Sequence, residues 1–258
     1  MTRSSLTLRS LLATVGLALA ASTAQAQHLV VSHDEWVTDN GFFGTNEKLF
    51  MSNALTWFGA GAGSQALIYS NSAMLNNVAF SGYLTGKGIA STVNANAASF
   101  APYKVVFVEA NQLLNAAGLT SYIQSGGNVV LFGGTGVPNA PGEAAYSNPF
   151  LNNFGFNFAS QYNGLGTTNT APFGATGPFG SALFTGVSSI YANSGNTISL
   201  TAPVANVTSQ LFQDDAGRGV FGAAVYQGAT TVAPEPATLA LVAFGMIVAV
   251  PLARRRRR

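Results

Sequence analysis

Two continuous apolar runs, separated by one helical stretch, constrain the fold of this chain most strongly. Residues 104–110 (KVVFVEA) and 128–134 (NVVLFGG) are rich in β-branched and aromatic residues and show no alternation of polar and apolar positions. Such runs are typical of strands buried on both faces of a parallel sheet, which needs helices on both sides. The stretch between them, 111–127, ends in two glycines, which predicts a helix with a glycine stop.

The same alternation extends toward the N-terminus. Residues 28–32, 66–70 and 89–93 are predicted strands, and residues 46–58 and 73–84 are predicted helices. Strands that alternate with helices at this spacing predict an α/β domain with a single doubly wound, mostly parallel sheet. The pattern is looser after residue 155, where 163–180 reads as a loop and three later strands are predicted, at 196–200, 207–212 and 219–226.

The first 26 residues have the pattern of a secretory signal peptide. Arg3 and Arg9 precede an apolar stretch at 11–20, and Ala24 and Ala26 are the small residues that signal peptidase requires at its cleavage site. An uncleaved anchor is the alternative, but an apolar stretch of about ten residues is short for crossing a bilayer. We therefore expect a mature chain that begins at Gln27.

The last residues predict a membrane helix with a defined orientation. Residues 237–253 carry no charge, and at about 1.5 Å per residue they extend roughly 25 Å, near the short limit for a spanning helix. Basic residues flanking a membrane helix stay in the cytoplasm. The sequence thus predicts a body outside the inner membrane and a cytoplasmic cluster formed by Arg254, Arg255, Arg256, Arg257 and Arg258.

The three elements of this tail resemble a known sorting signal. Pro234, Glu235 and Pro236, followed by an apolar helix and a terminal arginine cluster, are similar to the tail of PEP-CTERM proteins. The resemblance implies that the chain is a substrate of exosortase, which cleaves near the Pro-Glu-Pro in bacteria that make extracellular polysaccharide. The expected organisation is a signal peptide at 1–26, an exported domain at 27–229 and a sorting tail at 230–258.

A second resemblance concerns the body. Residues 122–136 (YIQSGGNVVLFGGTG) resemble the helix, Gly-Gly, strand and turn of class I glutamine amidotransferase-like domains, which have a flavodoxin-like fold. That family carries its nucleophilic cysteine on the turn after this strand. Here the turn is Gly133-Gly134-Thr135-Gly136, and the chain has no cysteine. The resemblance therefore implies the fold and not the amidase chemistry.

The predicted sheet also indicates where a ligand would bind. Ligands of open α/β sheets bind at the carboxyl ends of the strands, and the polar residues expected there are His33, Asp34, Glu35, Glu109 and Thr135. A histidine beside carboxylates suits acid–base chemistry or metal binding. The alternative is that these side chains cap turns and helices. We expect a ligand rim and assign no catalytic residue, metal ligand or cofactor.

Composition excludes several functions. Without cysteine there is no disulfide and no thiolate site. Residues 27–233 hold four basic residues against eight acidic ones, which gives no basic stripe for nucleic acid. We expect an exported surface or matrix protein with a non-catalytic binding or structural role in the envelope or the extracellular polysaccharide layer. The alternatives are a polysaccharide-directed secreted hydrolase that uses the acidic and histidine residues at the strand ends, or a permanently membrane-anchored periplasmic domain.

Overall fold

The computed structural model of the chain describes residues 27–165, 168–170 and 177–228. The predicted signal peptide with Ala24 and Ala26, the Pro-Glu-Pro motif, the apolar segment 237–253 and the arginine cluster lie outside the described residues. Within the described residues, no helix has both the length and the apolar character needed to cross a membrane.

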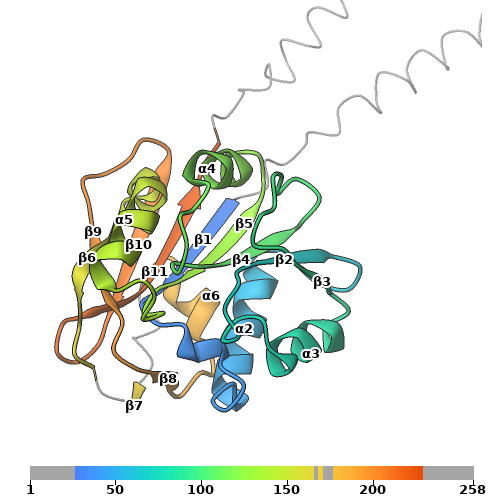
Figure 1. The fold of residues 1–258 in the computed structure, drawn as a ribbon, viewed down its shortest axis with the longest axis horizontal. Helices are drawn as coiled ribbons and strands as arrows, with labels where there is room; N and C mark the ends of the chain where they lie inside the picture. Colours follow the sequence, from blue (N-terminus) through green and yellow to red (C-terminus); the bar gives the residue numbers. More distant parts are fainter. Residues whose placement is uncertain (1–26, 166–167, 171–176, 229–258) are drawn as a thin grey trace, which may run out of the picture. The chain divides into compact units, whose positions relative to one another are not determined.

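A seven-stranded sheet organises the domain (Figure 1). Its parallel part comprises β1 (Gln27–Ser32), β5 (Asn128–Phe132), β4 (Val105–Glu109), β2 (Gln65–Tyr69) and β3 (Ala90–Val93), in that spatial order. On the other side of β1 lie β11 (Gly219–Tyr226) and then β10 (Val207–Gln213), each antiparallel to its neighbour. The prediction of an α/β fold with a mostly parallel sheet is confirmed, and the sheet is mixed.

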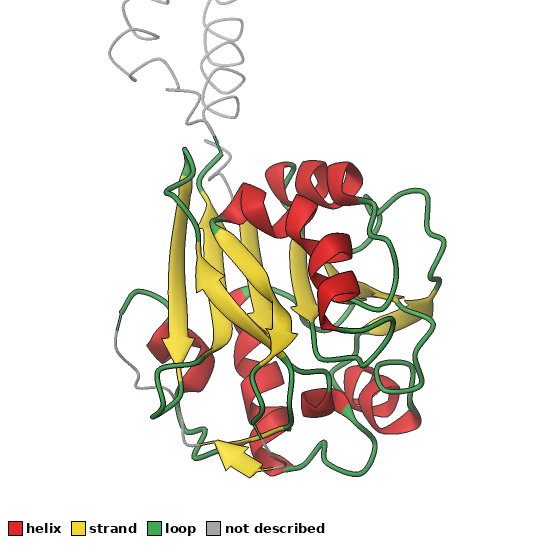
Figure 2. Cartoon of the chain, turned by 60° about the vertical axis from the view of Figure 1, so that its left-hand side comes forward, coloured by secondary structure: helices red, strands yellow, loops and turns green. Residues whose placement is uncertain are grey.

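Helices cover both faces of this sheet, as Figure 2 shows. One face packs against α2 (Thr45–Trp57), α3 (Val78–Gly86) and the short α6 (Gly180–Phe184), and the other packs against α4 (Ala116–Gln124) and α5 (Ala140–Leu151). Phe50 and Phe150 are fully buried on these two faces. Burying one such side chain contributes about 1.5–3 kcal/mol, which is why the apolar strands need cover on both sides.

Asparagine caps set the starts of two helices later than the sequence pattern predicts. The Phe80 N–H donates to Asn77 Oδ1 (2.9 Å), so α3 begins at Val78 and residues 73–77 form a loop. The Gly118 N–H donates to Asn115 Oδ1 (3.0 Å), so α4 begins at Ala116. An Asn side chain at the N-cap satisfies a backbone donor that the helix leaves unpaired. Residues 110–115 are thereby left as a loop at the end of β4.

Two small sheets and two 3₁₀ turns complete the described residues. The predicted strand 196–200 forms β9 (Asn196–Leu200), but it pairs with β6 (Phe156–Tyr162) and not within the main sheet. The short strands β7 (Thr168–Thr170) and β8 (Ile190–Ala192) pair near the start of α2. The 3₁₀ turns are η1 (Trp36–Thr38), which directly follows β1, and η2 (Asn152–Phe154).

Two positions along the sheet are topological switch points. The helix after β1 lies on one face of the sheet, whereas the helix after the adjacent β5 lies on the other face. The helix after β2 and the helix after the adjacent β4 also lie on opposite faces of the sheet. Crevices at such points are where open α/β sheets bind ligands. The residues that follow β1, β5, β4 and β2 are therefore the first place to look for a site.

Candidate functional site

Four acidic side chains gather at the carboxyl ends of the parallel strands. Asp34 and Glu35 follow β1, Glu109 ends β4, and Glu143 lies in the first turns of α5. None is more than 4% exposed. The charges of Glu109, Asp34 and Glu143 all act on Glu35. The structure thus brings together three of the predicted rim residues and adds Glu143, which the sequence analysis did not select.

Glu35 and Glu109 form a carboxyl–carboxyl contact. The charge of Glu109 acts on Glu35, and two ionised carboxylates side by side repel each other, which favours a form in which one of them carries a proton. Burial raises the pKa of both groups, and the charge of Glu109 raises that of Glu35 further. Glu35 Oε2 meets no N–H or O–H donor. The folded state therefore favours protonation of this pair relative to the unfolded chain.

Glu109 also connects the ends of β4 and β2. Its Oε2 accepts hydrogen bonds from the Ser70 hydroxyl and from Asn111 Nδ2, the latter at 3.0 Å. The Ser72 N–H in turn donates to Ser70 Oγ (2.8 Å). At the β2/β4 switch point, the hydrogen bonds of the Glu109 carboxyl fix the position of the loop after β2.

Asp34 likewise accepts hydrogen bonds that fix the backbone at the end of β1. The Trp36 N–H donates to its Oδ1 (3.2 Å), and the Asn193 N–H donates to its Oδ2. Burial raises the pKa of Asp34 to about 7, although these backbone donors favour the ionised form. The side chain therefore ties η1 to the segment that leaves β8.

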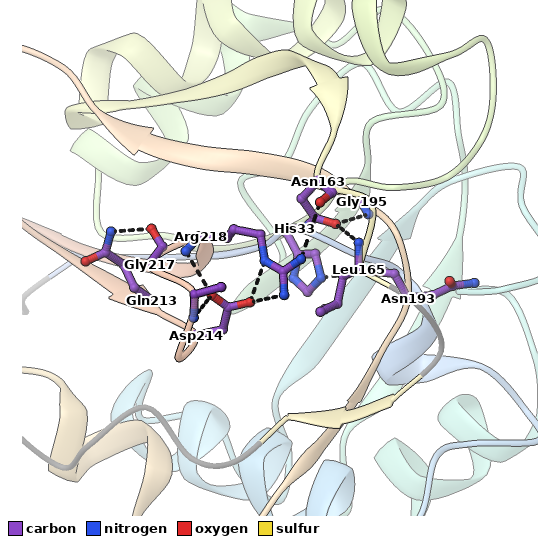
Figure 3. A network of polar contacts seen from close by, with 10 residues as sticks. His33, Asn163, Leu165, Asn193, Gly195, Gln213, Asp214, Gly217 and Arg218 are labelled. Carbon is purple, nitrogen blue, oxygen red and sulfur yellow. Dashed lines mark hydrogen bonds and ion pairs between the residues drawn. The ribbon is translucent and has the colours of Figure 1, made fainter.

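His33 is enclosed between two backbone carbonyls. Its Nδ1 lies 2.9 Å from Val220 O and its Nε2 lies 3.1 Å from Asn193 O. Burial lowers the pKa of the imidazole to about 4, so at neutral pH only one of the two nitrogens donates. Figure 3 shows the ring beside the ion pair of Arg218 with Asp214, whose Nη2 and Oδ2 lie 2.7 Å apart. Both ring nitrogens therefore face backbone carbonyl oxygens, and the neutral ring donates a hydrogen bond to one of them.

Thr135 contacts the acid that the sequence analysis missed. Its Oγ1 lies 3.0 Å from Glu143 Oε1, which also accepts from the Tyr162 hydroxyl (2.7 Å). The Gly134 N–H donates to Glu143 Oε2 (2.8 Å). Burial raises the pKa of Glu143. A sequence signal existed, because Asn139 caps α5 and an acid one turn after a cap at a strand end lies beside that end.

A partly exposed aromatic cluster lies at the same end of the sheet. It consists of Trp36, Phe42 and Tyr191, and we use "aromatic cluster" for these three residues. Phe42 stacks on Tyr191 with ring centroids 3.8 Å apart, and Trp36 lies 5.2 Å from Phe42 and 6.0 Å from Tyr191. Trp36 and Tyr191 are half-buried, and Phe42 is 37% exposed. Nothing in the sequence links Tyr191 to the other two rings.

A buried carboxylate positions this cluster. Glu47 Oε1 accepts from the Tyr191 N–H (2.8 Å), and its Oε2 accepts from the Gly44 N–H at the start of α2 (3.0 Å). Together with the hydrogen bond that the Asn193 N–H donates to Asp34, this holds the middle and the end of β8 against the chain that follows β1. The acids near the aromatic cluster thus serve as supports for its backbone.

The loops that follow the parallel strands define a surface, which we call the carboxyl-end face: residues 33–44, 70–78, 93–103, 110–115 and 133–139. Of the six large apolar side chains that the described residues expose, five lie on this face: Phe42, Val78, Val93, Leu113 and Val137. The face also exposes seven asparagines: Asn40, Asn71, Asn76, Asn94, Asn96, Asn115 and Asn139. It contains no Lys or Arg. Exposed apolar side chains and neutral amides are thus concentrated at this end of the sheet.

The described residues contain no group of three His, Asp or Glu side chains arranged to hold a metal ion. Comparison with known protein families, characterised proteins and solved structures finds no significant match to this chain.

Proposed function

We propose that this protein is exported, sorted by an exosortase through its C-terminal tail, and serves a non-catalytic binding role in the extracellular polysaccharide layer. The sorting part rests on the Pro-Glu-Pro, the apolar segment and the arginine cluster in the sequence. The binding part rests on the carboxyl-end face, where exposed aromatic, apolar and amide side chains lie above buried acids.

One observation carries the preference for binding over hydrolysis. Glycosidases place two carboxyl groups roughly 5–10 Å apart on either side of a bond in a cleft that sugar and water can enter. Here Asp34 is 1% exposed and Glu109 is 0% exposed. Their oxygens accept hydrogen bonds from the chain's own backbone and side chains. Such acids support the face from below, and a sugar on the face does not reach them.

The intact mass of the protein, measured in each fraction of its host, tests this function. We expect a form that begins at Gln27, lacks the five C-terminal arginines and is recovered with the extracellular polysaccharide. A single membrane-bound form that retains Arg254 to Arg258 would contradict the sorting proposal and favour a permanently anchored periplasmic domain.

A matched pair of variants sharpens the test. Replacing Pro234, Glu235 and Pro236 together by alanine is expected to keep the protein in the membrane fraction. Pro203 lies exposed in the body, so Pro203→Ala is the control and is expected to be processed like the wild type. Equal processing of both variants would show that the motif does not direct cleavage.

A further inference from the structure

The carboxyl-end face has the features of a site for a chain of uncharged sugars. We infer that it binds an uncharged glycan, with the aromatic cluster as the stacking platform and the neighbouring amides as hydrogen-bonding partners. This inference rests on the proposed function and deepens it, because it names the class of ligand and the residues that contact it.

The aromatic cluster supplies the apolar part of such a site. The C–H groups on the face of a sugar ring pack on aromatic rings, whose faces carry partial negative charge. Trp36, Phe42 and Tyr191 lie within 6.0 Å of one another, and Phe42 reaches solvent. Ligand sites commonly combine aromatic walls of this kind with a few placed polar groups.

The platform is held in place before any ligand arrives. Glu47 and Asp34 fix the backbone of Tyr191 and Asn193. Asn46 adds a further tie, because its Nδ2 donates to Ser189 Oγ (3.3 Å). A preorganised surface loses little conformational entropy on binding, which favours affinity.

Amide side chains continue from the ends of the neighbouring strands. Asn71 Nδ2 donates to Gln112 Oε1 (3.4 Å), and Gln112 Nε2 donates to Ala95 O (3.3 Å). These bonds link the loops after β2, β4 and β3. Exposed Asn94 and Asn96 lie on the last of these loops. Amides offer both donors and acceptors, as sugar hydroxyls do.

The charge of the face selects against acidic glycans. Carboxylate and sulfate groups on a sugar are recognised by Arg and Lys. The loops of the carboxyl-end face have neither, and Arg218, which lies beside His33, is paired with Asp214. Of its acids, Asp34 and Glu35 are buried and Asp39 is half-buried, so its solvent-facing groups are mostly uncharged. Lys48 and Lys87 line a separate groove between α2 and α3, which serves as the control surface.

The test measures binding of sugar hexamers to the full-length protein by isothermal titration calorimetry. Cellohexaose, laminarihexaose and chitohexaose are the uncharged probes, and hexagalacturonate is the acidic probe. We expect at least one uncharged hexamer to bind and hexagalacturonate to bind at least about tenfold more weakly. If no uncharged hexamer binds, or if hexagalacturonate binds best, the inference is wrong.

Variants locate the site. Trp36→Ala is expected to weaken binding about tenfold or more, whereas Trp36→Phe keeps a ring and should retain most of the affinity. Phe42→Ala is a second variant at an exposed ring, in case Trp36→Ala does not fold. Lys87→Ala is the control in the groove between α2 and α3 and should bind like the wild type. A larger loss in Lys87→Ala than in either ring variant would overturn the inference.

The two proposals fail differently. A protein recovered with the matrix in its processed form, but indifferent to these hexamers and ring variants, would leave the proposed function standing and remove the glycan site. A protein that binds an uncharged hexamer through Trp36, yet stays in the membrane with its arginines, would do the reverse.

Discussion

The buried polar side chains at the two ends of the parallel strands differ in charge. At the amino end, His28 Nδ1 lies 3.0 Å from Asn128 Oδ1, and Asn128 Nδ2 donates to Lys104 O (3.0 Å) and Phe58 O (3.4 Å). This network is uncharged. At the carboxyl end, four acids are buried together, and burial raises the pKa of each of them.

The amino end of the sheet stabilises the fold, whereas the carboxyl end is where we propose that a ligand binds. Uncharged groups that satisfy one another stabilise a fold at little cost, whereas buried acids are expensive and persist where structure or function requires them. Here each acid holds part of the carboxyl-end face: Asp34 holds η1, Glu109 holds Ser70, and Glu143 holds the Gly134 turn. The hydrogen bonds that these acids accept from the loops offset part of the free energy that their burial costs.

The largest expected effect is a dependence of stability on pH that arises only at the carboxyl end. The raised pKa values of Glu35, Glu109 and Asp34 mean that the folded state keeps protons that the unfolded chain releases. The free energy of unfolding should therefore fall as pH rises from 6.5 to 9, by about 1.4 kcal/mol per pH unit for each proton retained. Urea unfolding at several pH values measures it.

Between pH 6.5 and 9, the change of stability with pH reports on the acids and not on the histidines. Burial lowers the pKa of both His28 and His33, so their contribution to stability is lost only as pH falls below about 6.5. Glu35→Gln should flatten the slope above pH 6.5, and His28→Gln should leave it unchanged. A wild-type stability that is constant across this range would contradict the raised pKa values of these acids.

The next largest effect is expected at the amino end. Asn128→Leu removes the partner of His28 and leaves two carbonyl oxygens, Lys104 O and Phe58 O, without their donor. Unsatisfied buried groups of this kind cost about 1–3 kcal/mol each, so we expect a loss of about 3 kcal/mol by urea unfolding. The slope with pH and any glycan binding should stay as in the wild type. A changed slope would mean that the two ends are coupled.

A smaller effect is expected where an acid supports the aromatic cluster. Glu47→Gln keeps one oxygen acceptor but loses the other, so either the Gly44 N–H or the Tyr191 N–H loses its partner. We expect a loss of about 1–2 kcal/mol in stability and faster hydrogen exchange in residues 188–193. Unchanged exchange there would show that Glu47 does not position β8.

The smallest effect on stability is expected on the face itself. Phe42 is 37% exposed, so Phe42→Ala should cost about 1 kcal/mol or less by urea unfolding. The pH slope should be unaffected, because no titrating group depends on this ring. A loss well above that of Asn128→Leu would place Phe42 in the core.

The sequence predicts the parallel sheet well and its surroundings poorly. Four of the five parallel strands, β1, β2, β4 and β5, are visible because burial on both faces requires apolar runs such as 105–109 and 128–132, whereas β3 is a mostly exposed edge strand. Helix α5 was missed because it contains two prolines and a glycine, with Pro149 inside it. The caps at Asn77 and Asn115 were not recognised, so two helices were predicted to start too early.

The strand pattern predicts where the five polar residues lie, but the sequence does not reveal their partners. His33, Asp34, Glu35, Glu109 and Thr135 do lie at the carboxyl ends of β1, β4 and β5, as the strand pattern predicts. Their partners lie far away in sequence, at Asn193 and Val220. Gly195 approaches His33 O so closely that a Cβ would not fit. Local patterns carry no information on such contacts.

Hydrogen exchange of the full-length protein, followed by mass spectrometry with and without the uncharged hexamer that binds most tightly, tests the central claim most directly. The account predicts slower exchange in residues 33–44, 70–77 and 188–193, at the carboxyl end, and no change in residues 58–64 and 124–128. Protection confined to the amino end, or to the groove between α2 and α3, would contradict it.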